Sequence, residues 1–180
     1  MASKTLFKGM LELMLINVRK LVSILLLIIL PLLLVMVSPE TAIALIQQQE
    51  EAPGQILYKS RHSLRDHQGN SWQVILFKRV KNGEVKDVSL RLVGFPGSVT
   101  FNHPEPLQIV FSNGRILEAV DEFGEKAPGP NVGQYDLTDI LPKISQADQI
   151  ELNLSIAQTK SAIAVPSPVV LEWKAINSPG

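Results

Sequence analysis

The chain has 180 residues, no cysteine and a formal net charge of zero. The absence of cysteine excludes disulfides, thiolate zinc sites, a cysteine nucleophile and lipid attachment through an N-terminal cysteine. Once an apolar N-terminal segment is set aside, the remaining length suits one ordinary domain.

The N-terminal segment has the features of an export signal. Residues 21–37 are apolar except for Ser23, and they follow basic residues. This pattern predicts a membrane-seeking helix of roughly 26 Å, slightly less than the ~30 Å hydrocarbon core. Ala42 and Ala44 stand where a signal peptidase requires small residues, so residues 1–44 are predicted to be a signal peptide cleaved after Ala44, or alternatively a retained membrane anchor. The basic N-terminal end stays cytoplasmic, so the folded part is expected outside the cytoplasm.

Residues 45–54 are predicted to be a linker because their polar run has no apolar period. A single β-rich domain then extends over residues 55–177. Segments 56–64 and 71–80 are rich in β-branched and aromatic residues, which predicts a hairpin. Asn82-Gly83 tolerates the positive φ angles of a tight turn, and apolar residues at 88, 90 and 92 alternate as a third strand.

The second half of the domain repeats this organisation. Residues 107–111 and 116–120 predict another hairpin, and residues 127–133 predict a Pro/Gly loop. A short helical turn capped by Thr138 or Asp139 is expected to extend through Leu141.

Two further strands and a helix are predicted to end the chain. Residues 150–156 alternate strictly as a half-buried strand, and residues 162–165 form a weaker one. Ser167 before Pro168 predicts a helix start. That helix has one apolar face, formed by Val169, Trp173 and Ile176. The pattern as a whole favours a mainly β fold, an antiparallel β-sandwich or barrel with a short C-terminal helix.

Charge is distributed unevenly along the domain. From Lys59 to Arg91 there are eight basic and three acidic residues, whereas from Glu105 to Glu151 there are three basic and nine acidic residues. If the two regions fold onto different surfaces, the domain carries a dipole that orients it against a charged partner or lipid.

Basic side chains are expected to gather on one face of the first three strands. Lys59, Arg61 and Arg65 share a pleat face, and Arg79 and Arg91 continue it on neighbouring strands. This face is a candidate contact for anionic lipid or an acidic protein surface, and the alternative is a solvated face. Nucleic acid is not expected, since the protein is predicted to be exported and interleaved aromatic residues are missing.

The loop at residues 121–133 is a second candidate contact region, because loops carry function on rigid scaffolds. Its candidate contact residues are Phe123, Pro128 and Pro130. The alternative is a stiff crossover between sheets.

Histidine and aspartate offer a weaker hypothesis of metal binding or general base catalysis. The candidates are His62, Asp66, His67 and His103, and the alternative is that these residues are solvated or hydrogen-bonded. Serine-nucleophile frameworks and phosphate-binding glycine loops are not found in the sequence. No cofactor is predicted.

Several stretches are similar to a known family. They are residues 54–58 with 61–66, residues 71–77, residues 92–97, residues 131–137 and Glu172-Trp173. The chain resembles a cyanobacterial family catalogued as domain of unknown function 3122. The resemblance implies a cyanobacterial source, and hence the periplasm or the thylakoid lumen. It implies no activity, cofactor or catalytic residue.

Three hypotheses of function follow. The first is a non-enzymatic accessory or binding module at the outer face of a membrane, attached through the N-terminal segment and in contact with a membrane protein complex or anionic lipid. The second is a small periplasmic or lumenal hydrolase or metal-dependent enzyme that uses the histidine and aspartate candidates. The third is a carrier of an apolar ligand held inside the barrel.

Overall fold

The computed structural model describes residues 46–147, 149–157 and 160–178, and four residues of the N-terminal segment, Arg19, Lys20, Ser23 and Leu25. The predicted export signal therefore lies almost wholly outside the described residues. Within the described part of the chain, no helix is long and apolar enough to cross a membrane. Residues 44–180 form one compact unit, separate from residues 1–43.

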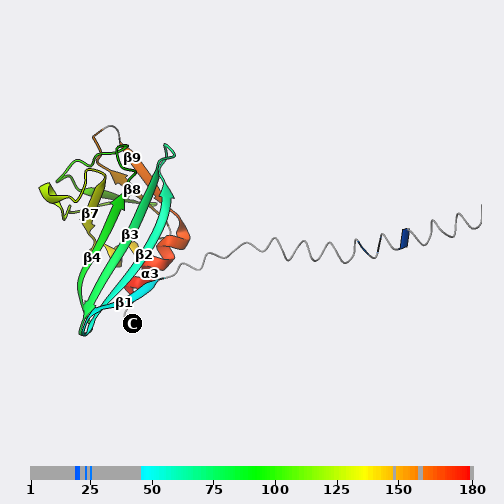
Figure 1. Ribbon diagram of the computed structural model, residues 1–180, viewed down its shortest axis with the longest axis horizontal. Helices are drawn as coiled ribbons and strands as arrows, with labels where there is room; N and C mark the ends of the chain where they lie inside the picture. Colours follow the sequence, from blue (N-terminus) through cyan, green and yellow to red (C-terminus); the bar gives the residue numbers. More distant parts are fainter. Residues whose placement is uncertain are drawn as a thin grey trace, which may run out of the picture. The chain divides into compact units, whose positions relative to one another are not determined.

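Five antiparallel strands form the larger sheet, which faces the viewer in Figure 1. Its strand order is β1-β2-β3-β4-β7. The strands are β1 (Gln47–Ala52), β2 (Gln55–Arg65), β3 (Ser71–Lys81), β4 (Glu84–Val93) and β7 (Val132–Asp136).

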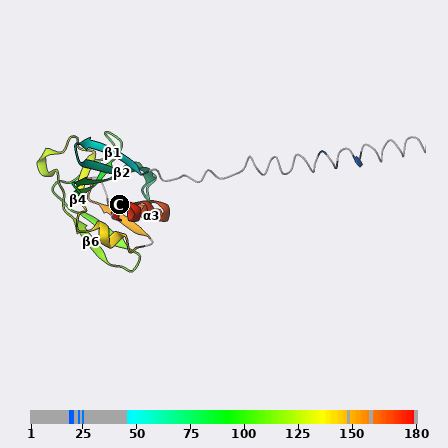
Figure 2. The same cartoon turned by 90° about the horizontal axis from the view of Figure 1, so that it is seen from below.

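A second antiparallel sheet has the order β6-β5-β8-β9, and Figure 2 shows the two sheets as two layers with α3 beside them. Its strands are β5 (Leu107–Phe111), β6 (Ile116–Ala119), β8 (Ile150–Leu154) and β9 (Ser161–Val165). The helical elements described after β1 are the 3-10 turn η1 (Gly124–Lys126), α2 (Leu141–Ile144) and α3 (Ser167–Asn177).

The space between the sheets is filled by one hydrophobic core. Trp72, Leu76 and Leu90 from the larger sheet belong to the same buried cluster as Ile109 and Leu152 from the smaller one. Each sheet is open in the described chain, with β1 and β7 or β6 and β9 at its edges. The mainly β fold with a C-terminal helix is confirmed, and the barrel alternative is wrong.

Local sequence patterns located most of the strands. The hairpin β2–β3, the third strand β4 and the hairpin β5–β6 all form where they were predicted. Asn82 and Gly83 adopt φ angles of 52° and 82°, as a tight turn with two positive φ angles requires.

Two strands correct the sequence analysis. The predicted linker is wrong for residues 47–52, which form β1 and pair with β2 in a register that sets Gln49 opposite Leu57. All side chains of β1 are exposed, so this strand is held by backbone pairing with β2. Its sequence has no alternation of apolar residues from which a strand could be predicted. The predicted Pro/Gly loop is wrong at its end, where Val132 begins β7 and pairs with Val93 of β4.

The helix boundaries also differ from the prediction. α2 begins at Leu141, where the predicted turn was to end, and Ile140 at its cap position provides no side-chain cap. Ser167 is the first residue of α3 and Pro166 occupies the cap position. Beyond the end of β8, Ile156 forms an isolated bridge with Phe101.

α3 packs against the inner face of the larger sheet and is held there by polar contacts. Trp173 Nε1 donates to Ser60 Oγ at 3.2 Å, and His62 Nε2 lies 2.6 Å from a carboxylate oxygen of Glu172. Lys78 Nζ donates to a carbonyl of the last helical turn at 2.7 Å. The predicted apolar face is confirmed, since its three residues are all buried: Val169, Trp173 and Ile176.

Candidate binding surface

The outer face of the larger sheet carries the predicted basic group. Strand register sets Arg61 opposite Ile75 and Ile75 opposite Arg91. One row further along, Lys59 lies opposite Phe77. Because side chains alternate between the two faces of a sheet, these five residues share the outer face. We call them the basic face.

The basic side chains differ in how far they are neutralised. Arg79, one row away, contacts Glu51 at 3.0 Å and Asp87 at 2.8 Å. Lys59 and Arg61 have no ion-pair partner among the described residues. Lys59 and Arg61 therefore keep their positive charge for a partner, whereas the charge of Arg79 is largely neutralised.

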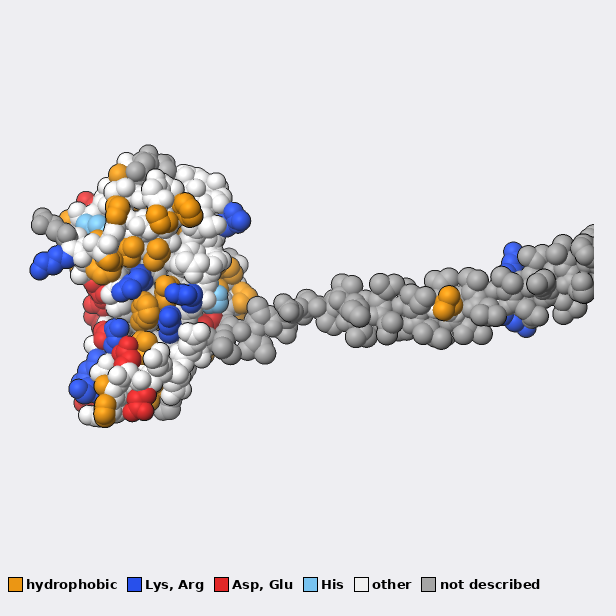
Figure 3. Space-filling model, viewed as in Figure 1, with side chains coloured by type: hydrophobic (Ala, Val, Ile, Leu, Met, Phe, Trp, Pro, Cys, Tyr) orange, Lys and Arg blue, Asp and Glu red, His pale blue; other side chains and the backbone are white. Residues whose placement is uncertain are grey.

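Apolar side chains lie beneath these charges. The Lys59 ammonium lies 6.0 Å and the Arg91 guanidinium 5.3 Å from the centre of the Phe77 ring. Ile75 is 5 % exposed although it points outward. Long basic side chains cover apolar surface with their stems while their charged ends stay in water. Figure 3 shows this mixture of orange and blue side chains at the middle of the face.

The second candidate region adjoins the basic face. The Phe123 ring lies 5.8 Å from the Arg91 guanidinium, and Glu122 accepts a hydrogen bond from Ser89 Oγ at 2.9 Å. Pro128 and Pro130 are exposed, and the carbonyl of Pro130 accepts a hydrogen bond from the Phe101 backbone N–H at 2.8 Å. The loop thus extends the basic face by the Phe123 ring.

The histidine candidates are not brought together. His62 contacts Glu172 under α3, His67 lies 3.4 Å from Glu151 at the surface, and His103 pairs with the buried Asp121. Among the described residues, no group of three potential metal ligands is found. This geometry gives no support to the metal-dependent hypothesis.

The Asp66 carboxylate is held by hydrogen bonds that give it a structural role. Its carboxylate accepts hydrogen bonds from Asn70, from Trp72 Nε1 at 3.1 Å and from Ser161 Oγ at 2.7 Å. Burial alone raises the pKa of this carboxyl, but the hydrogen bonds from Asn70, Ser161 and Trp72 outweigh it and lower the pKa to about 2. A carboxylate engaged in this way is not available to accept a proton near neutral pH.

The pair of His103 and Asp121 is largely enclosed. His103 Nδ1 contacts the Asp121 carboxylate, and His103 Nε2 is buried without a partner among the described residues. Burial and the nearby Asp121 charge raise the pKa of the Tyr135 hydroxyl. His103 does not line the three cavities of the described chain that are discussed below.

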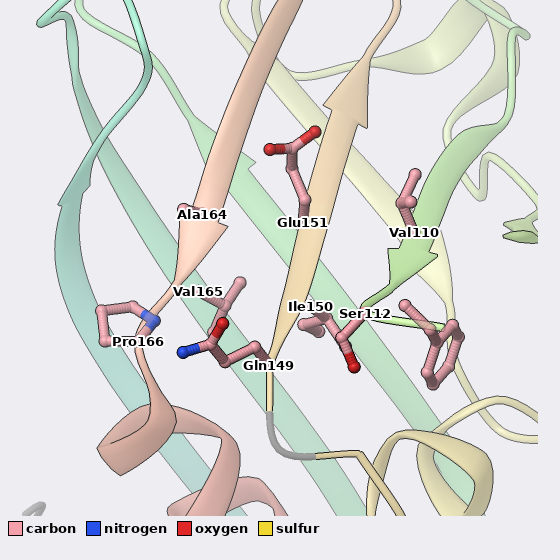
Figure 4. Close-up of a pocket in the computed structure, with 9 residues that line it drawn as sticks. Val110, Ser112, Gln149, Ile150, Glu151, Ala164, Val165 and Pro166 are labelled. Atoms are coloured by element: carbon pink, nitrogen blue, oxygen red, sulfur yellow. The ribbon is translucent and has the colours of Figure 1, made fainter. Parts of the chain in front are cut away.

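The outer face of the smaller sheet is hollowed and carries glutamates. An open hollow of about 350 Å³ lies across β5, β8 and β9. Figure 4 shows the residues that line it, with Ala164 beside Glu151. A second hollow of about 410 Å³ is lined by Glu105 and Glu118. Part of the acidic sequence region therefore lies away from the basic face, but Glu122 and Asp136 lie beside Ser89 at its margin, so the predicted separation of charge is only partial.

A family model described as "Protein of unknown function (DUF3122)" matches residues 44–176. The chain belongs to this family. The match confirms the resemblance seen in the sequence. No curated protein and no solved structure matches the chain.

In this DUF3122 protein, the sequence analysis missed the apolar part of the surface. Ile75 and Phe77 were not singled out, and neither was Phe95, which follows β4 and is 73 % exposed. A signal was available in the unbroken apolar run of residues 74–77, because a strand with one solvated face normally alternates. Apolar residues at outward positions are typical of a contact surface.

Proposed function

We propose that this protein is an exported, non-enzymatic accessory module that binds an acidic protein surface at the outer face of a membrane. The observation that carries this proposal is the basic face, where Lys59 and Arg61 lack acidic partners among the described residues and lie beside apolar side chains. Charged groups steer encounter, and a buried aromatic centre supplies binding energy.

The margins of the basic face favour a protein over a lipid bilayer as the partner. Asp87 and Glu122 lie beside it, joined to Arg79 and to Ser89. A uniformly anionic bilayer would be repelled by these carboxylates, whereas a protein surface can place positive or polar groups opposite them. Export itself rests on the predicted N-terminal segment and its cleavage signature.

The first test is a crosslinked pull-down of the tagged full-length protein from its native membranes. Replacing Lys59, Arg61 and Arg91 with Glu should lower recovery of a defined membrane protein complex at least about tenfold, because repulsion replaces attraction at the centre of the interface. The matched control reverses three basic residues elsewhere on the domain: Arg115, Lys143 and Lys160. Its recovery should equal that of the wild type.

Two results would contradict this function. One is unchanged recovery by the variant of the basic face, and the other is the absence of any defined partner. A third result would identify the partner as lipid and contradict the proposal of an acidic protein surface. In that case no protein is recovered, and the wild-type domain binds vesicles of anionic phospholipid whereas the variant of the basic face does not.

A further inference from the structure

A cleft of about 440 Å³ opens at the end of the domain where the larger sheet extends beyond the smaller one, toward the lower end of Figure 1. The C-terminal end of α3 forms its other wall. Most of the lining is apolar, and the residues that provide it are Ile56, Tyr58, Val80, Val85, Ala175 and Ile176. Its volume lies within the range of small-molecule sites.

An irregularity in strand pairing gives the cleft its apolar rim. The register between β3 and β4 shifts after Arg79, so that Val80 lies opposite Val85. An extra residue in one strand changes which side chains face a given side. Val85, which is 48 % exposed, therefore lines the cleft in place of the neighbouring Lys86.

A single buried charge lies in this apolar setting. Lys78 is 6 % exposed, and it is the only charged residue among the described residues that line the cleft. Its Nζ donates to the carbonyls of Ile176 at 2.7 Å and Asn177 at 3.4 Å, and it lies 5.9 Å from the centre of the Tyr58 ring. An ammonium has three N–H donors, so one remains.

The charge of Lys78 has no carboxylate partner within ion-pair distance in the described chain. The two carbonyl groups at the end of α3 accept hydrogen bonds from Lys78 but do not neutralise a full positive charge. Burial of an ammonium without a counter-charge is costly, and burial lowers the pKa of Lys78 accordingly. A ligand carboxylate would provide the missing counter-charge.

We propose that the cleft binds a fatty acid, with its carboxylate on Lys78 and its chain against Val80, Val85 and Ile176. The site is on the inner side of the sheet, opposite the basic face, and does not depend on the proposed function. It also differs from a ligand held between the sheets, because that space is filled by the core.

The test measures displacement of a fluorescent probe, dansyl-undecanoic acid, from residues 44–180, the compact unit that contains the whole described core. Myristic acid should displace the probe, and tetradecanol, which has the same chain without the carboxylate, should be at least about tenfold weaker. Equal displacement by both, or no binding of the probe, would overturn the proposal.

Two variants locate the site. Lys78→Met should weaken probe binding at least about tenfold, and Val85→Trp should do so by filling the cleft without touching the ammonium. Lys143→Met, at an exposed position on α2, is the control and should bind normally. If Lys78→Met does not fold, Val85→Trp alone tests whether the probe binds in this cleft. Normal probe binding by Val85→Trp would overturn the proposal. The Glu variant of the basic face should bind the probe like the wild type, which separates this site from the proposed function.

Discussion

The Asp66 carboxylate ties the turn after β2 to β9. It accepts bonds from Asn70 in the turn, Trp72 in the core and Ser161 at the start of β9. Five donors reach its two oxygens, since the backbone N–H groups of Gln68 and Asn70 also bond to it. One ionised side chain therefore links a local turn to the long-range packing of the two sheets.

This arrangement predicts acid sensitivity. The pKa of Asp66 is about 2 in the folded protein against an ordinary value of 3.8. Its contribution to stability is therefore complete above about pH 5 and is lost as the pH falls toward 2. Asp66→Asn should lower the free energy of unfolding by about 2 kcal/mol at pH 7, and the difference should shrink below pH 4. Urea denaturation across this pH range measures it. The exposed Asp139→Asn serves as control, and a deficit for Asp66→Asn that does not change with pH would contradict the assignment.

Gly94 allows close packing where β4 ends. A Cβ atom there would lie 2.3 Å from Val99 Cγ2 and 3.1 Å from the Trp72 ring. Gly94→Ala should therefore destabilise the domain by about 1–3 kcal/mol through overpacking. At Gly129 the nearest atom is the flexible Asn131 Oδ1 at 3.2 Å, so Gly129→Ala should cost less. Thermal denaturation of both variants compares them, and equal losses would show that packing against Trp72 is not the cause.

At the scale of elements, α3 and β2 are joined by the contact between Glu172 and His62. Single substitutions cannot isolate the energy of this contact, because each one leaves the other side chain without its partner. The Glu172 side chain is 2 % exposed and lies 2.6 Å from His62 Nε2. His62→Leu leaves a buried carboxylate without its partner and should cost about 3 kcal/mol. His62→Leu combined with Glu172→Leu should cost less than the sum of the two single changes. A double-mutant cycle by urea denaturation measures the coupling, and additive losses would mean that the contact contributes nothing.

At the scale of the whole molecule, both sheets share one core, so the domain is expected to unfold as a unit. In residues 44–180, far-ultraviolet circular dichroism and tryptophan fluorescence should report one coincident transition. Leu76→Ala in the larger sheet and Leu152→Ala in the smaller one should each lower stability by about 2–5 kcal/mol and shift that same transition. Two separate transitions would show that the sheets are independent.

Whether a strand could be predicted from the sequence depends on whether its signal is local or comes from pairing with another strand. β4 and β8 were predicted from the alternation of apolar residues, and β2 and β3 from their β-branched and aromatic residues, and both signals are local. β1 was missed because its polar side chains are all exposed and only pairing with β2 makes it a strand. For the candidate surface, alternation alone placed Lys59 and Arg61 on one face. Strand register was needed to show that Arg91 joins them across Ile75.

The sequence by itself determined the class of fold, the apolar face of α3 and the family, because apolar periodicity and family motifs are properties of short stretches. Only the tertiary structure decided the partners of the charged groups. His62 contacts the carboxylate of Glu172, which is 110 positions away in the sequence, and Lys78 donates hydrogen bonds to carbonyl groups at the end of α3. These contacts depend on how strands and helix are packed, and no local pattern encodes which distant carboxylate or carbonyl a given side chain will reach.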